Sequence, residues 1–261
     1  MRAPEVALAV IDFRCRTDNY GVLVHDEASG ATASVDAPDG DAITAELTRR
    51  GWRLDLILTT HHHGDHVAGN LALKAAFGCR IVGPAIEVQK IPGIDQPVED
   101  GGTLALAGRK ISVLATPGHT RGHVAYFMPA DGMVFVGDTL FDMGCGRIFE
   151  GTAGAMWDSL SRLAALPEAT RVYCGHDYAA QNARFALTVE PDNAALVARA
   201  ADVEALAVSG TLAPPTTIGM ELRTNPFLRV NETGMRARLG LRAEAPAAAV
   251  FAELRLRKDR F

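Results

Sequence analysis

Four side chains that could bind metal ions lie within six consecutive positions of the sequence: His61, His63, Asp65 and His66. Three imidazoles and a carboxylate supply nitrogen and oxygen ligands suited to zinc, iron or manganese. Residues at alternate positions of an extended loop project to the same side, so His61 and His63 can bind one ion. Asp65 and His66 follow the turn at Gly64 and can reach another. The spacing therefore predicts two metal ions.

Three further candidate ligands lie far apart in the sequence, each just beyond a predicted strand: His119, Asp138 and His176. A carboxylate has two oxygens and can bridge two cations at ~3.5–4 Å, so we assign the bridge to Asp138. A lone HxH pattern is more often structural than metal-binding, but HxHxDH with these three residues is much more specific. The sequence therefore predicts a two-metal site of five histidines and two aspartates.

Three other histidines, His25, His62 and His123, have no clear ligand geometry. We expect them to be solvent-exposed, structural or supporting residues. His123 is the best candidate for supporting a metal ligand, because it closes the TPGHTRGH loop that carries His119.

The elements that must position these residues begin with a sheet. Short segments rich in Val and Ala, separated by turn residues, predict strands at Val6 to Val10, Tyr20 to Val24 and Ala31 to Val35. Asp41 is expected to cap a helix that ends at Gly51. The apolar run Leu54 to Thr59 predicts a buried strand, and Val67 to Phe77 a helix closed by Gly78. The histidine cluster thus lies in a strand-to-helix loop, where functional sites are common.

The second half repeats this arrangement and then changes in character. Strands are predicted at residues 103–106, 111–115, 124–128, 133–136 and 171–174. From Tyr178 the sequence becomes Ala-rich, with helices expected over 179–189 and 192–208 and loops around the later prolines. Mixed strands and helices in two successive halves predict an α/β sandwich with a smaller helical C-terminal part.

Composition limits the class of protein. A length of 261 residues with 48% hydrophobic content fits a globular protein with a sizeable core. The first thirty residues contain no uninterrupted apolar run, so we expect a cytoplasmic protein with no secretory signal or membrane span. A net charge of -5 gives no global positive field that would attract nucleic acid. Four scattered cysteines predict reduced thiols and no disulfides: Cys15, Cys79, Cys145 and Cys174.

The distribution of the ligand-type residues resembles the metallo-β-lactamase superfamily, and finer motifs resemble glyoxalase II, the hydroxyacylglutathione hydrolase family. These motifs extend from the catalytic part into the tail of the chain. They are THHHGDHVAGN (Thr60–Asn70), TPGHT (Thr116–Thr120), GDTLF (Gly137–Phe141), GCGR (Gly144–Arg147), GHDY (Gly175–Tyr178) and TNPFLR (Thr224–Arg229).

The resemblance implies a metallo-β-lactamase-like αββα sandwich over residues 1–176 and a helical substrate-binding domain over 177–261. It assigns one metal ion to His61, His63 and His119. The other ion is assigned to Asp65, His66 and His176, with Asp138 shared. Asp65 and Asp138 are also the expected catalytic residues.

The resemblance further implies that glutathione is bound by Arg147, Tyr178, Arg255 and Lys258. Glutathione carries two carboxylates, for which basic side chains are suitable partners. The family commonly has tyrosine where this chain has Phe149, which keeps the ring and lacks the hydroxyl. One hydrogen bond of about 0.5–1.5 kcal/mol is therefore expected to be missing. The basic tail RLRKDRF could also be read as a solvated terminus.

The implied reaction is hydrolysis of S-D-lactoylglutathione to glutathione and D-lactate, a step of methylglyoxal detoxification. Two cations sharing Asp138 would lower the pKa of a water from ~15.7 toward ~7 and so provide a nucleophile at neutral pH. A thiol leaving group has a pKa near ~8.5 and departs as thiolate without a dedicated general acid. The absence of an obvious extra Glu or Lys beside the motifs is consistent with this reaction.

Other functions remain open at the level of sequence. A persulfide dioxygenase of the same superfamily shares HxHxDH and would use a single iron. A nuclease or phosphodiesterase would need a basic groove or an RNA-binding segment, and a non-enzymatic scaffold would need no complete ligand set. We expect two divalent metal ions, zinc first and iron or manganese as alternatives, a small glutathione thioester as the ligand, and a monomer that binds neither nucleic acid nor membrane.

Overall fold

The computed structural model describes residues 8–261 and divides into two compact units. The first comprises Met1–Ala115 and Gly122–Gly137, and the second Thr116–Arg121 and Asp138–Phe261. These units follow spatial compactness rather than the predicted division at residue 176, which stays a prediction.

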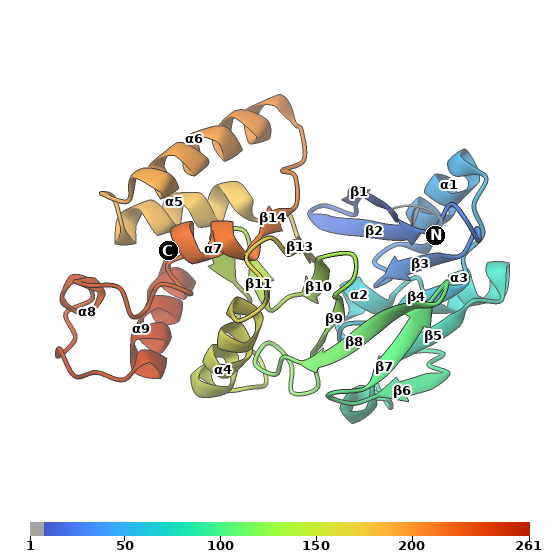
Figure 1. Ribbon diagram of the computed structural model, residues 1–261, viewed down its shortest axis with the longest axis horizontal. Helices are drawn as coiled ribbons and strands as arrows, with labels where there is room; N and C mark the ends of the chain where they lie inside the picture. Colours follow the sequence, from blue (N-terminus) through green and yellow to red (C-terminus); the bar gives the residue numbers. More distant parts are fainter. Residues whose placement is uncertain (1–7) are drawn as a thin grey trace, which may run out of the picture. The chain divides into compact units, whose positions relative to one another are not determined.

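The first unit opens with a six-stranded sheet, seen in blue to cyan in Figure 1. Its first three strands form an antiparallel meander, and the third to sixth strands run parallel. In spatial order the strands are β1 (Ala9–Cys15), β2 (Asn19–His25), β3 (Thr32–Val35), β4 (Leu56–Leu58), β5 (Arg80–Pro84) and β6 (Gln96–Val98). The strand predicted from Val6 begins outside the described residues.

Helices pack on this sheet. Apolar side chains of α1 (Gly40–Arg50) and α3 (Asn70–Phe77) share one core cluster with β4 and β5. The expected cap at Asp41 is wrong by two residues. The carboxylate of Asp39 instead accepts the backbone N–H groups of Asp41 and Ala42, because Asp39 is the residue with extended backbone.

The helix predicted from Val67 to Phe77 is interrupted. A short helix, α2 (Gly64–Val67), ends before Gly69, and α3 begins after it. Gly69 lies against the backbone at the start of α1, since a Cβ there would lie 2.7 Å from the backbone nitrogen of Gly40, and this close packing accounts for the glycine. The chain between α3 and the next ladder also contains η1 (Ala85–Glu87) and β6.

The first unit also contains an antiparallel ladder of β7 (Thr103–Leu106), β8 (Arg109–Ala115), β9 (Val124–Met128) and β10 (Met133–Gly137). The predicted strands coincide with these to within two residues at each end. The inner residues of β9 and β10 are almost fully buried, which explains their continuous apolar sequences.

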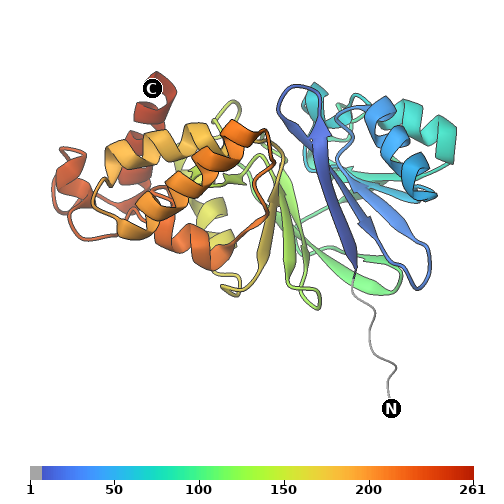
Figure 2. The ribbon, with the colours of Figure 1, turned by 90° about the horizontal axis from the view of Figure 1, so that it is seen from above.

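The second unit is mainly helical (Figure 2). Its strands pair in two short ladders: β11 (Leu140–Phe141) with β12 (Gly144–Cys145), and β13 (Arg171–Cys174) with β14 (Thr216–Thr217). Its helices are α4 (Ala153–Ala164), α5 (Ala179–Val189), α6 (Ala194–Ser209), α7 (Ile218–Thr224), α8 (Met235–Arg238) and α9 (Ala247–Arg260). The predicted helices correspond to α5 and α6, whereas α4, α7, α8 and α9 were missed.

The core of the second unit combines small and aromatic residues. Alanines of α5 and α6 let these helices pack closely side by side. The rings of Phe185 and Phe227 stack at 5.9 Å, and Phe251 of α9 lies edge-on to Phe227. Consequently α9 is anchored by its apolar face, and the basic tail is part of a helix.

All four cysteines are free and buried.

Candidate metal centre and substrate-binding residues

The carboxylate of Asp36 holds the start of the loop after β4. Asp36 accepts hydrogen bonds from the backbone N–H and the hydroxyl of Thr60, at 2.7 and 2.8 Å. Its Oδ2 also lies 2.8 Å from Nδ1 of His66. A carboxylate can only accept here, so Nδ1 of His66 carries the proton and its Nε2 keeps a lone pair for a metal ion.

His61 is oriented by the same chain of contacts. Its Nδ1 lies 3.0 Å from Oγ1 of Thr60. The Thr60 hydroxyl donates a hydrogen bond to Asp36, so Nδ1 of His61 is the donor to Thr60. Nε2 of His61 therefore carries the lone pair, and it lies 3.1 Å from Nδ1 of His63. Two ring nitrogens facing one another at this distance fit a shared cation, as the sequence predicts for this pair.

Asp65 lies on the same side of the loop as His66. Its Oδ2 is 3.7 Å from Nε2 of His66 and accepts a hydrogen bond of 3.1 Å from the side chain of Asn19. Asn19 also donates to the backbone carbonyl of Asp65 and is itself buried. The four ligand-type residues of the first unit thus form two neighbouring pairs, and Asn19 and Asp36 fix them.

The second unit brings together the other three predicted ligands. Nε2 of His119 and Nε2 of His176 each lie 3.3 Å from the same oxygen of Asp138. Nδ1 of His119 lies 2.8 Å from the backbone carbonyl of Arg147, to which it donates. All three ligand-type side chains are buried. Two imidazoles converging on one carboxylate, with one ring fixed through its outer nitrogen, have the arrangement of metal ligands.

Backbone geometry places each of these three residues just after a strand. Asp138 follows β10, His176 follows β13 and His119 lies four residues beyond β8. The loop that carries His119 packs against Gly151, where a Cβ would lie 2.6 Å from the backbone of Gly118. This packing closes the loop that carries His119. The donor set of each unit fits divalent metal ions.

The remaining histidines have other surroundings. His25 stacks on Trp52 at 3.9 Å and bonds Thr32, so it is structural. Nδ1 of His62 lies 2.9 Å from the buried carboxylate of Glu87, which also accepts the backbone N–H of His62. His123 is fully buried and its ring stacks on His61 at 4.8 Å, consistent with the predicted supporting role.

Three predicted substrate-binding residues lie close to these ligands in the second unit. Tyr178 stacks on His176 with ring centroids 4.8 Å apart and an interplanar angle of 2°. Phe149 is 63% exposed and lies edge-on to His119 at 5.3 Å. Arg147 is exposed, while its backbone carbonyl binds His119. The rings of Tyr178 and Phe149 thus contact predicted ligands, and Arg147 is linked to His119 through its main chain.

The two basic residues of α9 differ in their surroundings. Arg255 is buried, donates to the carbonyl of Cys145 at 2.8 Å and pairs with Asp259 at 2.8 Å. Its hydrogen bonds therefore hold the GCGR segment. Lys258 is partly exposed and donates to the carbonyl of Gln181. Burial, reinforced by the charges of Arg255 and Arg147, lowers the pKa of Lys258 to about 8.

Sequence reasoning missed the residues that hold the ligands, among them Asn19, Asp36 and Glu87. One signal for Asp36 is available, since it is an acidic residue directly after a predicted strand. The partners of Asp36, however, are 24 and 30 residues away in sequence, and only the fold brings them together.

Comparisons with known proteins agree with this geometry. Residues 37–176 match the family model of the metallo-beta-lactamase superfamily, and residues 177–261 match that of the hydroxyacylglutathione hydrolase C-terminus. The hydroxyacylglutathione hydrolase of Rhizobium meliloti (strain 1021) is 57% identical over 255 residues, which cover 98% of this chain and 99% of the relative. The chain belongs to the hydroxyacylglutathione hydrolase family. It is a thioester hydrolase with the metallo-β-lactamase fold and a helical C-terminal part.

Solved structures support the fold. The crystal structure of ETHE1 from Myxococcus xanthus has a TM-score of 0.66 and 25% identity, covering 97% of this chain and 98% of its own. TTHA1623 in a di-iron-bound form has a TM-score of 0.63 and 27% identity, covering 84% of this chain and 100% of its own. The dioxygenase alternative is not favoured, because the full-length relatives at much higher identity are named as hydrolases. Within residues 8–261, no helix combines the length and apolar character that a membrane span requires.

Proposed function

We propose that this chain hydrolyses the thioester of S-D-lactoylglutathione, giving glutathione and D-lactate in methylglyoxal detoxification. The single observation that carries the proposal is the convergence of His119 and His176 on one oxygen of Asp138, in a chain of this family. We further propose that the enzyme acts as a monomer in the cytoplasm, independently of nucleic acid and membranes.

Seven side chains are the proposed metal ligands. His61, His63 and His119 would hold one ion. Asp65, His66 and His176 would hold the other, and Asp138 would contribute to both. Asp36 and the carbonyl of Arg147 support this assignment, because each accepts a hydrogen bond from the outer nitrogen of a histidine and leaves Nε2 for a metal ion. Zinc is proposed first, with iron or manganese as alternatives that the same ligands would accept.

When bound, the metal ions supply an activated water and Lewis-acid polarisation of the thioester carbonyl. The chain's own contribution is to hold the ligands in place before substrate arrives. Asp36 and Thr60 fix the loop of the first unit, and Arg147 fixes His119 through its backbone. Asp65 and Asp138 are the proposed catalytic carboxylates, since each offers an oxygen beside a histidine Nε2. The thiolate leaves unaided, so no further acid is needed.

Substrate binding is proposed to use Arg147, Phe149, Tyr178, Arg255 and Lys258. Arg147 and Lys258 would attract the carboxylates of glutathione as charged donors. Arg255 acts through its bond to Cys145, since its guanidinium is buried. Phe149 and Tyr178 offer ring surfaces beside His119 and His176.

The test is hydrolysis of S-D-lactoylglutathione by the purified protein, followed as loss of thioester absorbance, with metal content measured on the same sample. Rapid turnover with about two metal ions per chain supports the proposal. Absence of turnover in fully metal-loaded protein would overturn it. Oxygen consumption on glutathione persulfide with one bound iron would instead indicate a dioxygenase.

A further inference from the structure

The hairpin formed by β11 and β12 has a strained turn. Its strands pair Leu140 with Cys145 and Phe141 with Gly144, so the turn consists of Asp142 and Met143. Met143 has a φ of 52°, in the left-handed region that residues other than glycine rarely adopt. A conformation of this kind persists only where neighbouring groups fix it.

Helix α7 and the residue that follows it supply these groups. The carboxylate of Glu221 accepts the backbone N–H of Met143 at 2.9 Å and the side-chain amide of Asn225 at 2.8 Å. The amide nitrogen of Asn225 also lies 3.2 Å from the carbonyl of Phe141 and 2.9 Å from that of Gly144. Both ends of the turn are thus bonded to side chains that lie 78 and 81 residues away in sequence.

Helix α5 completes the enclosure of the turn. Asn182 donates to the carbonyl of Asp142 at 3.0 Å. A Cβ at position 144 would collide with the same amide group, which explains the glycine there. Three side chains from the helical part of the chain therefore form hydrogen bonds with the backbone of the turn and its flanking residues.

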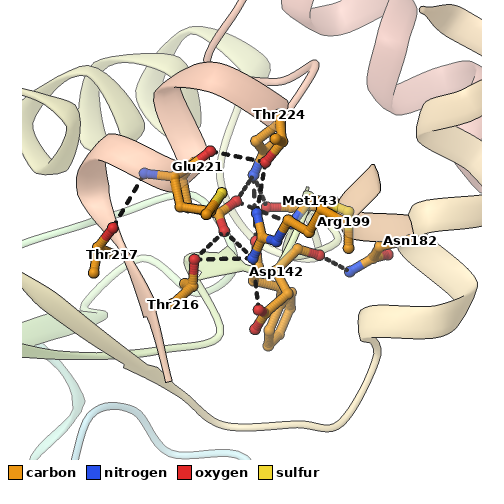
Figure 3. Close-up of polar contacts among 12 residues, drawn as sticks. Asp142, Met143, Asn182, Arg199, Thr216, Thr217, Glu221 and Thr224 are labelled. Atoms are coloured by element: carbon orange, nitrogen blue, oxygen red, sulfur yellow. Dashed lines mark hydrogen bonds and ion pairs between the residues drawn. The ribbon is translucent and has the colours of Figure 1, made fainter. Parts of the chain in front are cut away.

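A buried ion cluster holds Glu221 in place (Figure 3). The guanidinium of Arg199, from α6, lies 2.7 Å from Asp142 and 2.6 Å from Glu221, and it also bonds Thr216 and Thr224. Glu221 is fully buried. Here two carboxylates share one guanidinium cation, so the cluster has an excess negative charge. A buried ion cluster of this kind is poor evidence for stabilisation of the fold. The role of this cluster is to fix the direction of each hydrogen bond that its members make.

The hairpin connects two parts of the proposed site. Asp138 lies two residues before β11, and Arg147 lies two residues after β12. At the last residue of the hairpin, the carbonyl of Cys145 accepts a hydrogen bond from Arg255. The carbonyl of Arg147 in turn accepts a hydrogen bond from Nδ1 of His119. A shift of the turn would therefore move the side chain of Arg147 and the acceptor of His119 together.

We propose that Glu221 and Asn225 are positioning residues, which fix the β11–β12 turn so that Arg147 is placed to bind glutathione and His119 is oriented to bind metal. This inference rests on the proposed function for the identity of the substrate. Arg199 holds Glu221 by charge, and neither Glu221 nor Asn225 touches the substrate. The helical part of the chain thereby sets the geometry of the metal-binding part through one turn.

Two variants remove different contacts to the turn. Glu221→Ala removes the acceptor of the Met143 N–H and leaves one carboxylate paired with Arg199. Asn225→Ala removes the donor to the two carbonyls and leaves every charge in place. Glu221→Gln keeps one oxygen that can accept the Met143 N–H and serves as the conservative rescue. Glu204→Ala is the control, because it removes an exposed ion pair between α5 and α6.

The readouts are the dissociation constant for glutathione, the affinity for zinc, and KM and kcat for the thioester. All are measured at a temperature well below the midpoint of thermal unfolding of each variant. We expect Glu221→Ala and Asn225→Ala each to weaken glutathione and zinc binding about tenfold or more, as for loss of a group that supports a ligand. Glu221→Gln should recover most of both affinities, and Glu204→Ala should leave them unchanged.

Folded variants with wild-type affinities for glutathione and zinc would overturn the inference, even with lowered thermal stability, because the cluster would then act only on stability. If Glu221→Ala does not fold, Asn225→Ala decides, since it disturbs no charge. If the wild-type protein does not hydrolyse the thioester, the proposed function fails. The zinc affinities of the variants still test whether the turn orients His119.

Discussion

The backbone carbonyl of Arg147 lies 2.8 Å from Nδ1 of His119, and Arg147 is also the residue whose side chain is proposed to bind glutathione. One residue therefore serves the metal ligand through its main chain and the substrate through its side chain. Substitution of Arg147 removes only the second role, because the carbonyl remains. Displacement of the loop would affect both metal binding and substrate binding. A variant that weakens both therefore has a displaced loop, whereas one that weakens substrate binding alone has lost a charge.

His63→Ala should abolish metal-dependent turnover and leave the fold intact. His63 is partly exposed and shares one proposed ion with His61, 3.1 Å away between ring nitrogens. Losing a supporting residue typically costs about 10–100-fold, so losing a ligand should cost more. Metal content and kcat/KM, with circular dichroism as the check on folding, measure this effect. Retained activity would contradict the site assignment.

Asp36→Asn should weaken metal binding by about 10–100-fold. Its carboxylate receives two hydrogen bonds from Thr60 and one from Nδ1 of His66, and an amide offers only one oxygen. Competition with a chelator measures the affinity. Asp39→Asn is the matched control, because asparagine also caps a helix N-terminus and the side chain of Asp39 caps α1. Equal affinities in both variants would show that Asp36 does not orient His66.

Local sequence was sufficient for the strands that precede the ligands. Residues 133–136 and 171–174 are short, largely apolar runs. They match β10 to within one residue and β13 at both ends. Their burial explains the agreement, because a strand buried on both faces is apolar throughout. Helix α5 was predictable for a similar reason, since its Ala-rich face packs on α6.

The parts that escaped prediction depend on distant residues. The β11–β12 hairpin has two residues in each strand, and its turn is fixed by Glu221, 78 residues from Met143. Helix α9 was missed because its sequence is charged. It is stabilised by burial of Phe251 and by Arg255, which reaches Cys145 across 110 residues of sequence. Local pattern carries no information about such pairs.

Phe149→Tyr should lower KM by about two- to tenfold with little change in kcat. The ring is exposed beside His119, so an added hydroxyl meets solvent or substrate rather than a packed core. One recovered neutral hydrogen bond contributes about 0.5–1.5 kcal/mol, which gives this range. Steady-state kinetics with S-D-lactoylglutathione measure it, and an unchanged KM would show that the substrate does not approach this ring.

Lys258→Ala should raise KM about tenfold while kcat changes less, because a charged hydrogen bond is lost from uniform binding. The pKa of Lys258 is lowered to about 8, so its positive charge is lost as pH rises through that value. KM of the wild type should therefore rise above pH 8. Lys258→Arg should keep its charge and show a flatter profile, whereas the alanine variant should show none of this rise. An identical rise in all three would assign it to another group.

Asp142→Asn should stabilise the protein at neutral pH. Burial and the negative charge of Glu221 raise the pKa of Asp142 from 3.8 to about 6. The positive charge of Arg199 acts in the opposite direction but does not cancel this effect. The thiol of Cys174 also faces this carboxylate, at 3.9 Å. The folded state thus holds the proton more tightly than the unfolded state. The stability linked to this group is complete below about pH 4 and is lost as pH rises through 6.

Asparagine cannot ionise and keeps an oxygen for Arg199, so the variant retains that stability at every pH. A shift of about two pKa units corresponds to about 3 kcal/mol, which is an upper bound because the Arg199 bond is weakened. Urea unfolding at pH 4, 5, 6 and 7.5 should show a difference in unfolding free energy that grows with pH. Glu204→Gln, in an exposed ion pair, should show almost no difference. A variant less stable than wild type at pH 7.5 would mean that the Asp142–Arg199 pair outweighs the burial of the excess charge.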